Sequence, residues 1–113
     1  MKKQVMQKII EAIRENLALA YQKAIDCDAM LEQLKEQGHG QFSAIFSDGF
    51  NTKADRFLPY VEEVAASFYP ITQLSVNQQN QLNAAEFSDI IKQLEIIFAT
   101  QTKFQQTFVE DSQ

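Results

Sequence analysis

The sequence predicts an all-α protein: an antiparallel, up-down-up bundle of three helices whose middle helix is kinked. Along three long segments, apolar residues recur at steps of three and four, which is helical spacing. Glycine and proline are scarce, with three Gly and two Pro among 113 residues. A fold of many short strands requires more turn signals than this. We therefore expect residues 1–113 to form a single helical domain with one hydrophobic core.

The first helix is expected over residues 2–36, a stretch without glycine or proline. Its apolar residues at helical spacing are Met6, Ile9, Ile13, Leu17, Ala20, Ala24, Cys27, Leu31 and Leu34. The stripe narrows at Ala20 and Ala24, where we expect aromatic rings to fill the space. Such a helix is roughly 50 Å long, too long for a compact domain with a radius of gyration of about 13 Å. Either its first turns project or fray, or a partner chain covers them.

A second helix is expected over residues 52–69. Glycines at 38 and 40 end the first helix, and residues 42–48 are expected to form a short turn. Thr52 resembles an N-cap, with Asp55 three residues later. Pro59 costs about 3 kcal/mol inside a helix, which leaves two interpretations. We favour a helix kinked at Pro59; the alternative is a break near Phe57, with Pro59 in the first turn of a new helix.

The third helix is expected over residues 84–109, after a polar connection over residues 72–83. Asn83 and Glu86 form the sequence pattern of a capping box. The apolar residues that follow at helical spacing are Phe87, Ile90, Ile91, Leu94, Ile97, Phe98, Phe104 and Phe108.

Composition limits the function classes. The net charge of −5 and the pI near 4.8 have the wrong sign for a domain that neutralises phosphates, so direct nucleic-acid binding is disfavoured. Cys27 is the only cysteine, which excludes an internal disulfide and suits a reducing compartment. We find neither a secretory signal pattern nor an apolar run long enough for a membrane span, and we expect a cytoplasmic location.

Catalytic motifs are missing from the sequence: it has no phosphate-binding glycine loop, no His-Glu-x-x-His pair and no nucleophile elbow. His39 is interpreted as a solvated loop residue. The acidic cluster of Asp26, Asp28 and Glu32 and the pair Glu62-Glu63 are interpreted as solvated helix faces. We therefore expect a protein that is not an enzyme and has no cofactor and no metal site.

Aromatic side chains supply the candidates for partner binding. Phe57, Phe68, Phe87 and Phe98 are expected in the core, whereas Phe42, Phe46, Phe50, Phe104 and Phe108 lie in irregular or terminal segments. Lys53 and Arg56 accompany these rings, and with Phe50 and Phe57 they would suit a partner segment that carries an apolar side chain and a carboxylate. Two solvated basic residues are the plainer alternative. The candidate contact residues are Phe46, Phe50, Lys53, Arg56 and Tyr60.

The same stretch resembles a known family. The run Phe50-Asn51-Thr52-Lys53-Ala54, followed by Leu58, Tyr60 and Glu62 or Glu63, is similar to the Phe-x-Thr-(Lys/Arg) segment and Tyr-x-x-Glu helix of the primosomal replication protein N'' (PriC) family. The segment 91–97, Ile-Lys-Gln-Leu-Glu-Ile-Ile, looks like that family's later Gln-Leu-Glu helix. The resemblance spans most of this chain but only the N-terminal half of the family. Gly49 departs from it, since the family usually has an apolar residue there.

The resemblance implies a role in replication restart. Members of the family contact single-stranded DNA, the acidic tail of single-strand-binding protein and the replicative helicase. The basic C-terminal region associated with DNA and the acidic tail has no counterpart in this sequence. What the resemblance implies for this chain is therefore a non-catalytic protein-interaction module with a protein partner, the helicase or single-strand-binding protein.

A second hypothesis is a structural or regulatory homodimer in which the long first helix packs against its own copy. In that case, substitution of Met6 and Ile13 by lysine should abolish the association.

Overall fold

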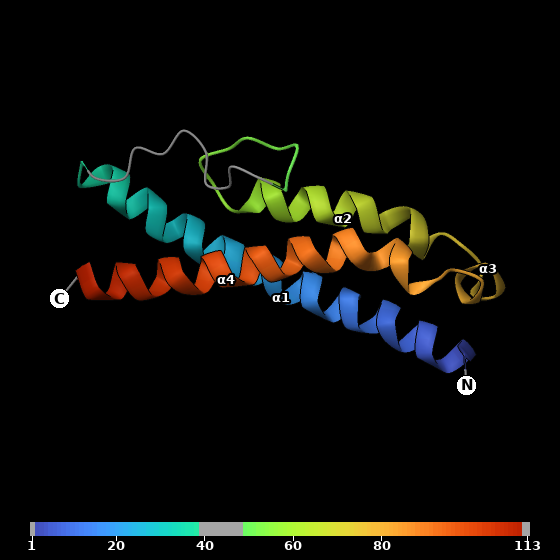
Figure 1. Cartoon of the computed structure of the whole chain (residues 1–113). Coiled ribbons are helices and arrows are strands. Elements are labelled where there is room, and N and C mark those ends of the chain that lie inside the picture. The colour runs from blue at the N-terminus through green and yellow to red at the C-terminus, as the bar shows by residue number, and fades with distance from the viewer. Residues whose placement is uncertain (1, 39–48, 112–113) are drawn as a thin grey trace.

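The computed structural model describes residues 2–38 and 49–111, with the side chains of 5–38 and 49–106. These residues contain helices and no strand, so the all-α class is confirmed (Figure 1). The elements in chain order are α1 (Lys2–Glu36), α2 (Leu58–Thr72), α3 (Val76–Asn80), the 3₁₀ helix η1 (Ala84–Phe87) and α4 (Ser88–Asp111).

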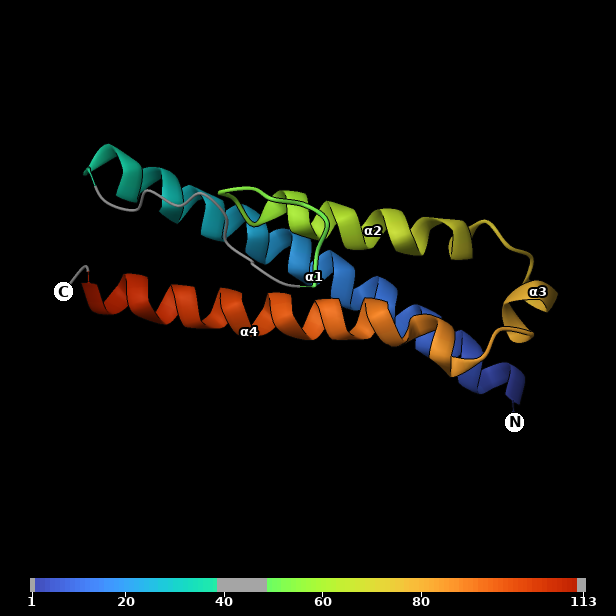
Figure 2. The ribbon, with the colours of Figure 1, turned by 45° about the horizontal axis from the view of Figure 1, so that its top comes forward.

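The three long helices pack against one another. α1 contacts both α2 and α4, and α2 contacts α4. α2 runs in the opposite direction to α1 and α4, and α3 lies at the turn between α2 and α4 (Figures 1 and 2). The molecule measures 52 × 25 × 19 Å, with a radius of gyration of 16.3 Å rather than the 13 Å of a compact domain. The difference arises because the 35 residues of α1 span the whole length.

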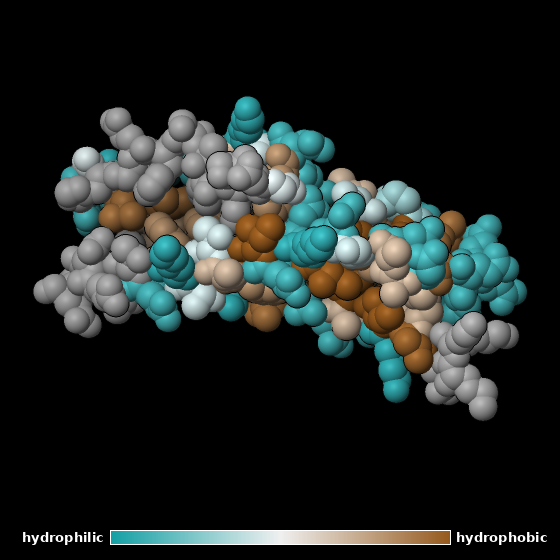
Figure 3. Space-filling model, in the orientation of Figure 1, coloured by the Kyte–Doolittle hydropathy of each residue, from teal (hydrophilic) through white to brown (hydrophobic). Residues whose placement is uncertain are grey.

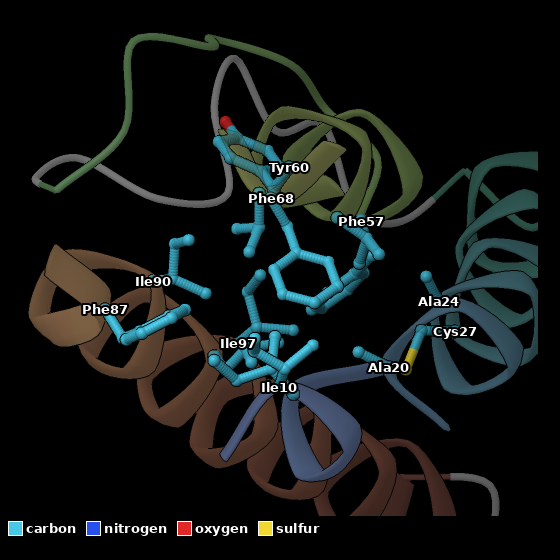
Figure 4. Close-up of a cluster of buried hydrophobic side chains, with 14 of the residues drawn as sticks. Ile10, Ala20, Ala24, Cys27, Phe57, Tyr60, Phe68, Phe87, Ile90 and Ile97 are labelled. Carbon is cyan, nitrogen blue, oxygen red and sulfur yellow. The ribbon is translucent and has the colours of Figure 1, made fainter. Parts of the chain in front are cut away.

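The core lies where the three helices meet. Phe57, Tyr60, Phe87 and Ile97 are almost completely buried. Figure 4 shows Phe57 pointing from the start of α2 into the space beside Ala20 and Ala24, and both alanines are fully buried. Phe57, Phe68 and Phe87 are core residues, as predicted.

Two other rings depart from their predictions. Phe98 is only half-buried, and Lys23 Nζ lies 5.5 Å from the centre of its ring. Phe104, expected as a surface candidate, is half-buried and lies 5.4 Å from Phe57, centroid to centroid. Both rings are partly buried against the core, and Lys23 also lies over the ring of Phe98.

The expected start of the middle helix at residue 52 is wrong. α2 begins at Leu58, and Pro59 lies in its first turn. Proline is favourable there because its missing N–H has no helical acceptor to bind and its φ is already helical. At the other end, α2 continues past Pro70 to Thr72. Pro70 has no N–H to donate to the carbonyl of Ala66, four residues earlier, so the last turn of α2 lacks one helical hydrogen bond.

The polar connection contains an element that the sequence interpretation missed. Ser75 caps α3: its hydroxyl accepts from Gln78 N, and its N–H donates to Gln78 Oε1. After α3, the N–H of Asn83 donates to the carboxylate of Glu86, 3.1 Å away, at the start of η1. The helix expected from residue 84 therefore begins as a 3₁₀ turn and becomes α4 only at Ser88. The turn expected at 42–48 lies outside the described residues.

Candidate functional site

Of the predicted contact residues, Phe50 and Tyr60 form part of the structure rather than a free surface. Tyr60 is fully buried, and Phe50 is half-buried with its ring edge-on to Tyr60, 5.3 Å between centroids. The Tyr60 hydroxyl donates to Ala54 O and accepts from Ala54 N, both at 2.9 Å. Tyr60 therefore fastens the segment 49–57 to α2, and in this structure it is not available to a partner.

Lys53 and Arg56 are exposed on that segment, and Phe46 lies outside the described residues. An ion pair between Lys35 on α1 and Asp55 fixes the segment between these two basic residues, with Nζ and Oδ2 2.7 Å apart. The hydrogen bond from Lys35 and its charge lower the pKa of Asp55. Contact of Lys53 and Arg56 with a partner stays a prediction.

The carboxylate of Asp28 joins α1 to the start of α2. It accepts from Phe57 N at 2.6 Å and from Leu58 N at 3.1 Å. These are N–H groups that a helix N-terminus leaves without a partner, and a negative charge is favourable there. The prediction that Asp28 belongs to a solvated face is wrong, and so is the prediction of Thr52 as the N-cap, since Phe57 occupies that position.

Glu63, on α2, also binds backbone N–H groups, in this case those at the beginning of the segment 49–57. Its carboxylate accepts from Asn51 N at 3.0 Å and from Thr52 N at 2.6 Å. From α4, Gln93 Nε2 donates to Gly49 O at 2.9 Å and to Glu63 Oε2 at 3.4 Å. Burial acts to raise the pKa of Glu63, but the hydrogen bonds from Thr52, Asn51 and Gln93 outweigh it and leave the pKa below its ordinary value. Glu63 is therefore a structural acid, contrary to the prediction of a solvated face.

A different part of the molecule offers an open apolar groove. The groove has a volume of about 590 Å³ and lies between the first turns of α1 and the connection from α3 to η1. Its walls are Val5, Met6, Ile9, Asn80, Gln81, Leu82, Asn83 and Ala84. None of these residues is charged, so the groove presents hydrocarbon walls with an amide rim.

Hydrogen bonds between amides fix one wall of the groove. Gln7 Nε2 donates to Gln79 Oε1 at 3.0 Å and to Asn80 Oδ1 at 3.3 Å. The side chain of Gln79 is buried and donates to Ile71 O at 2.8 Å. α3 therefore covers part of the first turns of α1, for which the sequence predicted no neighbour within the chain. It does not cover Val5, which is 56% exposed.

Next to the groove, α1 carries a second apolar stripe. We call it the α1 face and define it as Val5, Ile9, Ala12 and Leu19. Leu19 is 49% exposed and Ala12 is also exposed. Figure 3 shows hydrophobic surface where the first half of α1 emerges beside α4. Val5, Ala12 and Leu19 are spaced by seven residues, which returns a helix to nearly the same face; this signal was in the sequence, next to the stronger core stripe.

The last groups to consider are the cysteine thiol and the side chains that could bind a metal ion. Cys27 is fully buried, and burial, followed by the charges of Asp28 and Asp26, raises the pKa of its thiol to about 12. A neutral, buried thiol is not a nucleophile. Across the described residues, no group of three or more His, Cys, Asp and Glu side chains is placed to hold a metal ion. His39 lies outside them.

No helix in the described part of the chain combines the length and apolarity needed to cross a membrane. Comparison with family models, with curated proteins and with solved structures gave no match to this chain.

Proposed function

We propose that this chain is a non-catalytic protein-interaction module that binds another polypeptide at the α1 face and the adjoining groove. One observation carries the proposal: Val5 and Leu19 expose about half of their surface on the same side of α1, and the groove opens beside Val5. Burying such side chains contributes roughly 25 cal/mol per Å². Exposed apolar side chains grouped on one helix face mark interaction sites, and on the α1 face the polar Asn16 stands between Ala12 and Leu19.

The chemistry of the groove indicates the kind of partner. Uncharged walls receive aliphatic or aromatic side chains without desolvating a charge. The amide groups of Asn80, Gln81 and Asn83 lie at the groove and can bond to polar atoms of the bound segment. An amphipathic helix, which presents apolar anchors every three or four residues, has this combination of properties.

The fold acts in this proposal as a rigid support. We infer an up-down-up, three-helix bundle in which α2 and α4 fix α1 from two sides and leave the α1 face free. The resemblance to the PriC family supports a place in replication restart, with the replicative helicase or single-strand-binding protein as the partner. Lys53 and Arg56, both exposed, are proposed as a second contact for an acidic segment of that partner.

Photo-crosslinking in the source cells tests the proposal. A benzophenone amino acid at Leu19 should give a discrete crosslinked product, identified by mass spectrometry. The same probe at Tyr21, which is 47% exposed but is turned away from the α1 face, is the matched control. Products at position 21 that equal those at position 19, or none at either position, would refute the interaction surface.

The replication context has its own test. Purified helicase and single-strand-binding protein are each passed over the immobilised chain, with Leu19→Asp and the double variant Phe50→Ala, Arg56→Glu as comparisons. Binding that Leu19→Asp removes supports the proposed surface, and binding that only the double variant removes moves the site to residues 50–56. If neither protein binds, the link to replication restart is wrong.

A further inference from the structure

We infer that the polypeptide that covers the α1 face is a second copy of this chain, packed antiparallel against α1 about a two-fold axis. This inference rests on the proposed interaction surface and names its occupant. Charges on the two identical surfaces complement each other in this arrangement.

Lys8 and Glu15 are the two charges that would meet in this arrangement. Both are exposed and lie along the same edge of the α1 face, seven residues apart. Seven residues span about two helical turns, or roughly 10 Å. In the described part of the chain no ion pair engages either side chain, whereas the neighbouring Glu11 pairs with Arg14 at 3.9 Å. Two opposite charges that form no ion pair among the described residues therefore lie beside the α1 face.

Two-fold symmetry would bring these charges together. Lys8 and Glu15 are equally far from the point between Glu11 and Ala12. An antiparallel copy that crosses α1 at this point places each Lys8 opposite the Glu15 of the other copy, so a single axis creates two ion pairs. A parallel copy in register would instead place Lys8 level with Lys8 and Glu15 level with Glu15, so that neither charge would lie opposite its counterpart. The charges therefore favour the antiparallel arrangement.

The apolar residues agree with the same axis. Ala12 lies next to it, where a small side chain allows two helices to approach closely. Leu19 and Val5 lie at nearly equal distances on either side. Leu19 of one copy therefore lies level with Val5 of the other, so that both exposed side chains are covered. Because the contact is reciprocal, two valines and two leucines are covered at once.

Charge reversal gives a sharp test, measured by analytical ultracentrifugation of the purified full chain over a range of concentrations. Lys8→Glu and Glu15→Lys should each raise the dimer dissociation constant about tenfold, since each converts two attractions into two repulsions. The double reversal Lys8→Glu, Glu15→Lys restores both pairs and should return to within about threefold of the wild type. An equimolar mixture of the two single variants should form a mixed dimer.

Further variants separate this inference from the proposed function. Leu19→Asp should abolish the dimer and Tyr21→Asp should leave it unchanged, and unaltered circular dichroism shows that both variants fold. A wild-type chain that is monomeric at all concentrations, or a double reversal no better than the single ones, would overturn the inference. If the chain is monomeric but a probe at Leu19 still crosslinks to a different protein, the interaction surface stands and only its occupant is wrong.

Discussion

The two ends of α2 are fixed by different chemistry. At its beginning, the segment 49–57 is fastened by charged groups: Asp28, Glu63 and the Lys35–Asp55 pair. Beyond its end, α3 is fastened by the uncharged amides of Gln7, Gln79 and Asn80. Irregular backbone with several free N–H groups needs acceptors, and a carboxylate supplies two strong ones. α3 has its capping box of Ser75 and Gln78 for its first N–H groups, and the amide side chains anchor it.

The two ends of α2 therefore differ in how firmly the neighbouring segment is held and in how much apolar surface is left open. The segment 49–57 is bonded to all three long helices and places Phe50 and Phe57 against the core. α3 is bonded through a few amides, and the groove remains open beside it. The charged end should therefore respond to acid and to the loss of a single carboxylate, whereas the amide end should respond to neither.

The largest effect is expected at Asp28. Asp28→Ala leaves the N–H groups of Phe57 and Leu58 without their acceptor at the start of α2, and it should lower the free energy of unfolding by about 2–3 kcal/mol. Urea denaturation followed by circular dichroism measures this loss. The exposed neighbour Asp26 is the control, since Asp26→Ala should change stability by less than about 0.5 kcal/mol. Equal losses in the two variants would show that the cap contributes nothing.

Glu63 should make the charged end sensitive to acid. Its pKa is lowered in the folded chain from 4.5, so the unfolded chain binds more protons. The stabilisation is complete above about pH 5 and is lost as the pH falls through the folded pKa. Glu63→Gln should cost about 1–2 kcal/mol at pH 7, and the gap to the wild type should narrow at pH 3. A gap that is constant from pH 7 to pH 3 would contradict this role of the charge.

Asp55 belongs to the same acid window, because Lys35 lowers its pKa in the folded chain. Asp55→Asn is thus a second comparison in the pH series. Between pH 7 and pH 3, Asp55→Asn should reduce the pH dependence of the free energy of unfolding less than Glu63→Gln does. The reason is that the Lys35–Asp55 pair is more open to solvent.

Gln79 tests the amide end. Gln79→Ala removes the bond to Ile71 O and the acceptor for Gln7, and it should lower the free energy of unfolding by about 1 kcal/mol. Amides do not titrate, so this difference should stay the same from pH 7 to pH 3. The exposed Gln78 is a poor control because it caps α3; Gln81→Ala, also exposed, serves instead. A loss that depends on pH would show that the two ends are coupled.

Most of the helical content could be predicted from the sequence, because a long apolar stripe leaves few alternatives. Two features resisted prediction for local reasons. Proline suits both a kink and a first turn, and packing at Phe57 decided in favour of the first turn. α3 has the sequence Val-Asn-Gln-Gln-Asn, without an apolar stripe, and it is anchored by a buried glutamine. Such an anchor is visible only once its partners are in place.

The candidate site was harder to predict than the fold. The backbone N–H groups that Asp28 accepts from lie 29 and 30 residues away in sequence, so spacing along one helix could not distinguish it from a solvated acid. Tyr60 was predicted as a contact residue because aromatic rings favour interfaces, but its hydroxyl bonds to the backbone of Ala54 inside the fold. The α1 face was hidden because Val5 is adjacent to Met6, which belongs to the core.

The smallest effect is expected at Gln101, where α4 meets α1. Gln101 is fully buried, and its Nε2 donates to Ala20 O at 3.0 Å, while its Oε1 has no partner among the described residues. Ala20 lies in the interior of α1, where helical bonding already supplies its carbonyl with a donor. The hydrogen bond from Gln101 is therefore a second bond to a carbonyl that already has one, and losing it should cost little. The unpaired Oε1, in contrast, carries a desolvation cost.

Gln101→Met keeps the volume of the side chain and removes both polar atoms. It should raise the free energy of unfolding by about 0.5–1 kcal/mol, measured in urea at pH 7. Gln101→Ala is the comparison, and it should destabilise the chain because it leaves a cavity next to the small Ala20 and Ala24 side chains. If the methionine variant is also destabilised, the bond to Ala20 O outweighs the unpaired oxygen, and the centre of the α1–α4 interface depends on an amide in the same way as the α3 end.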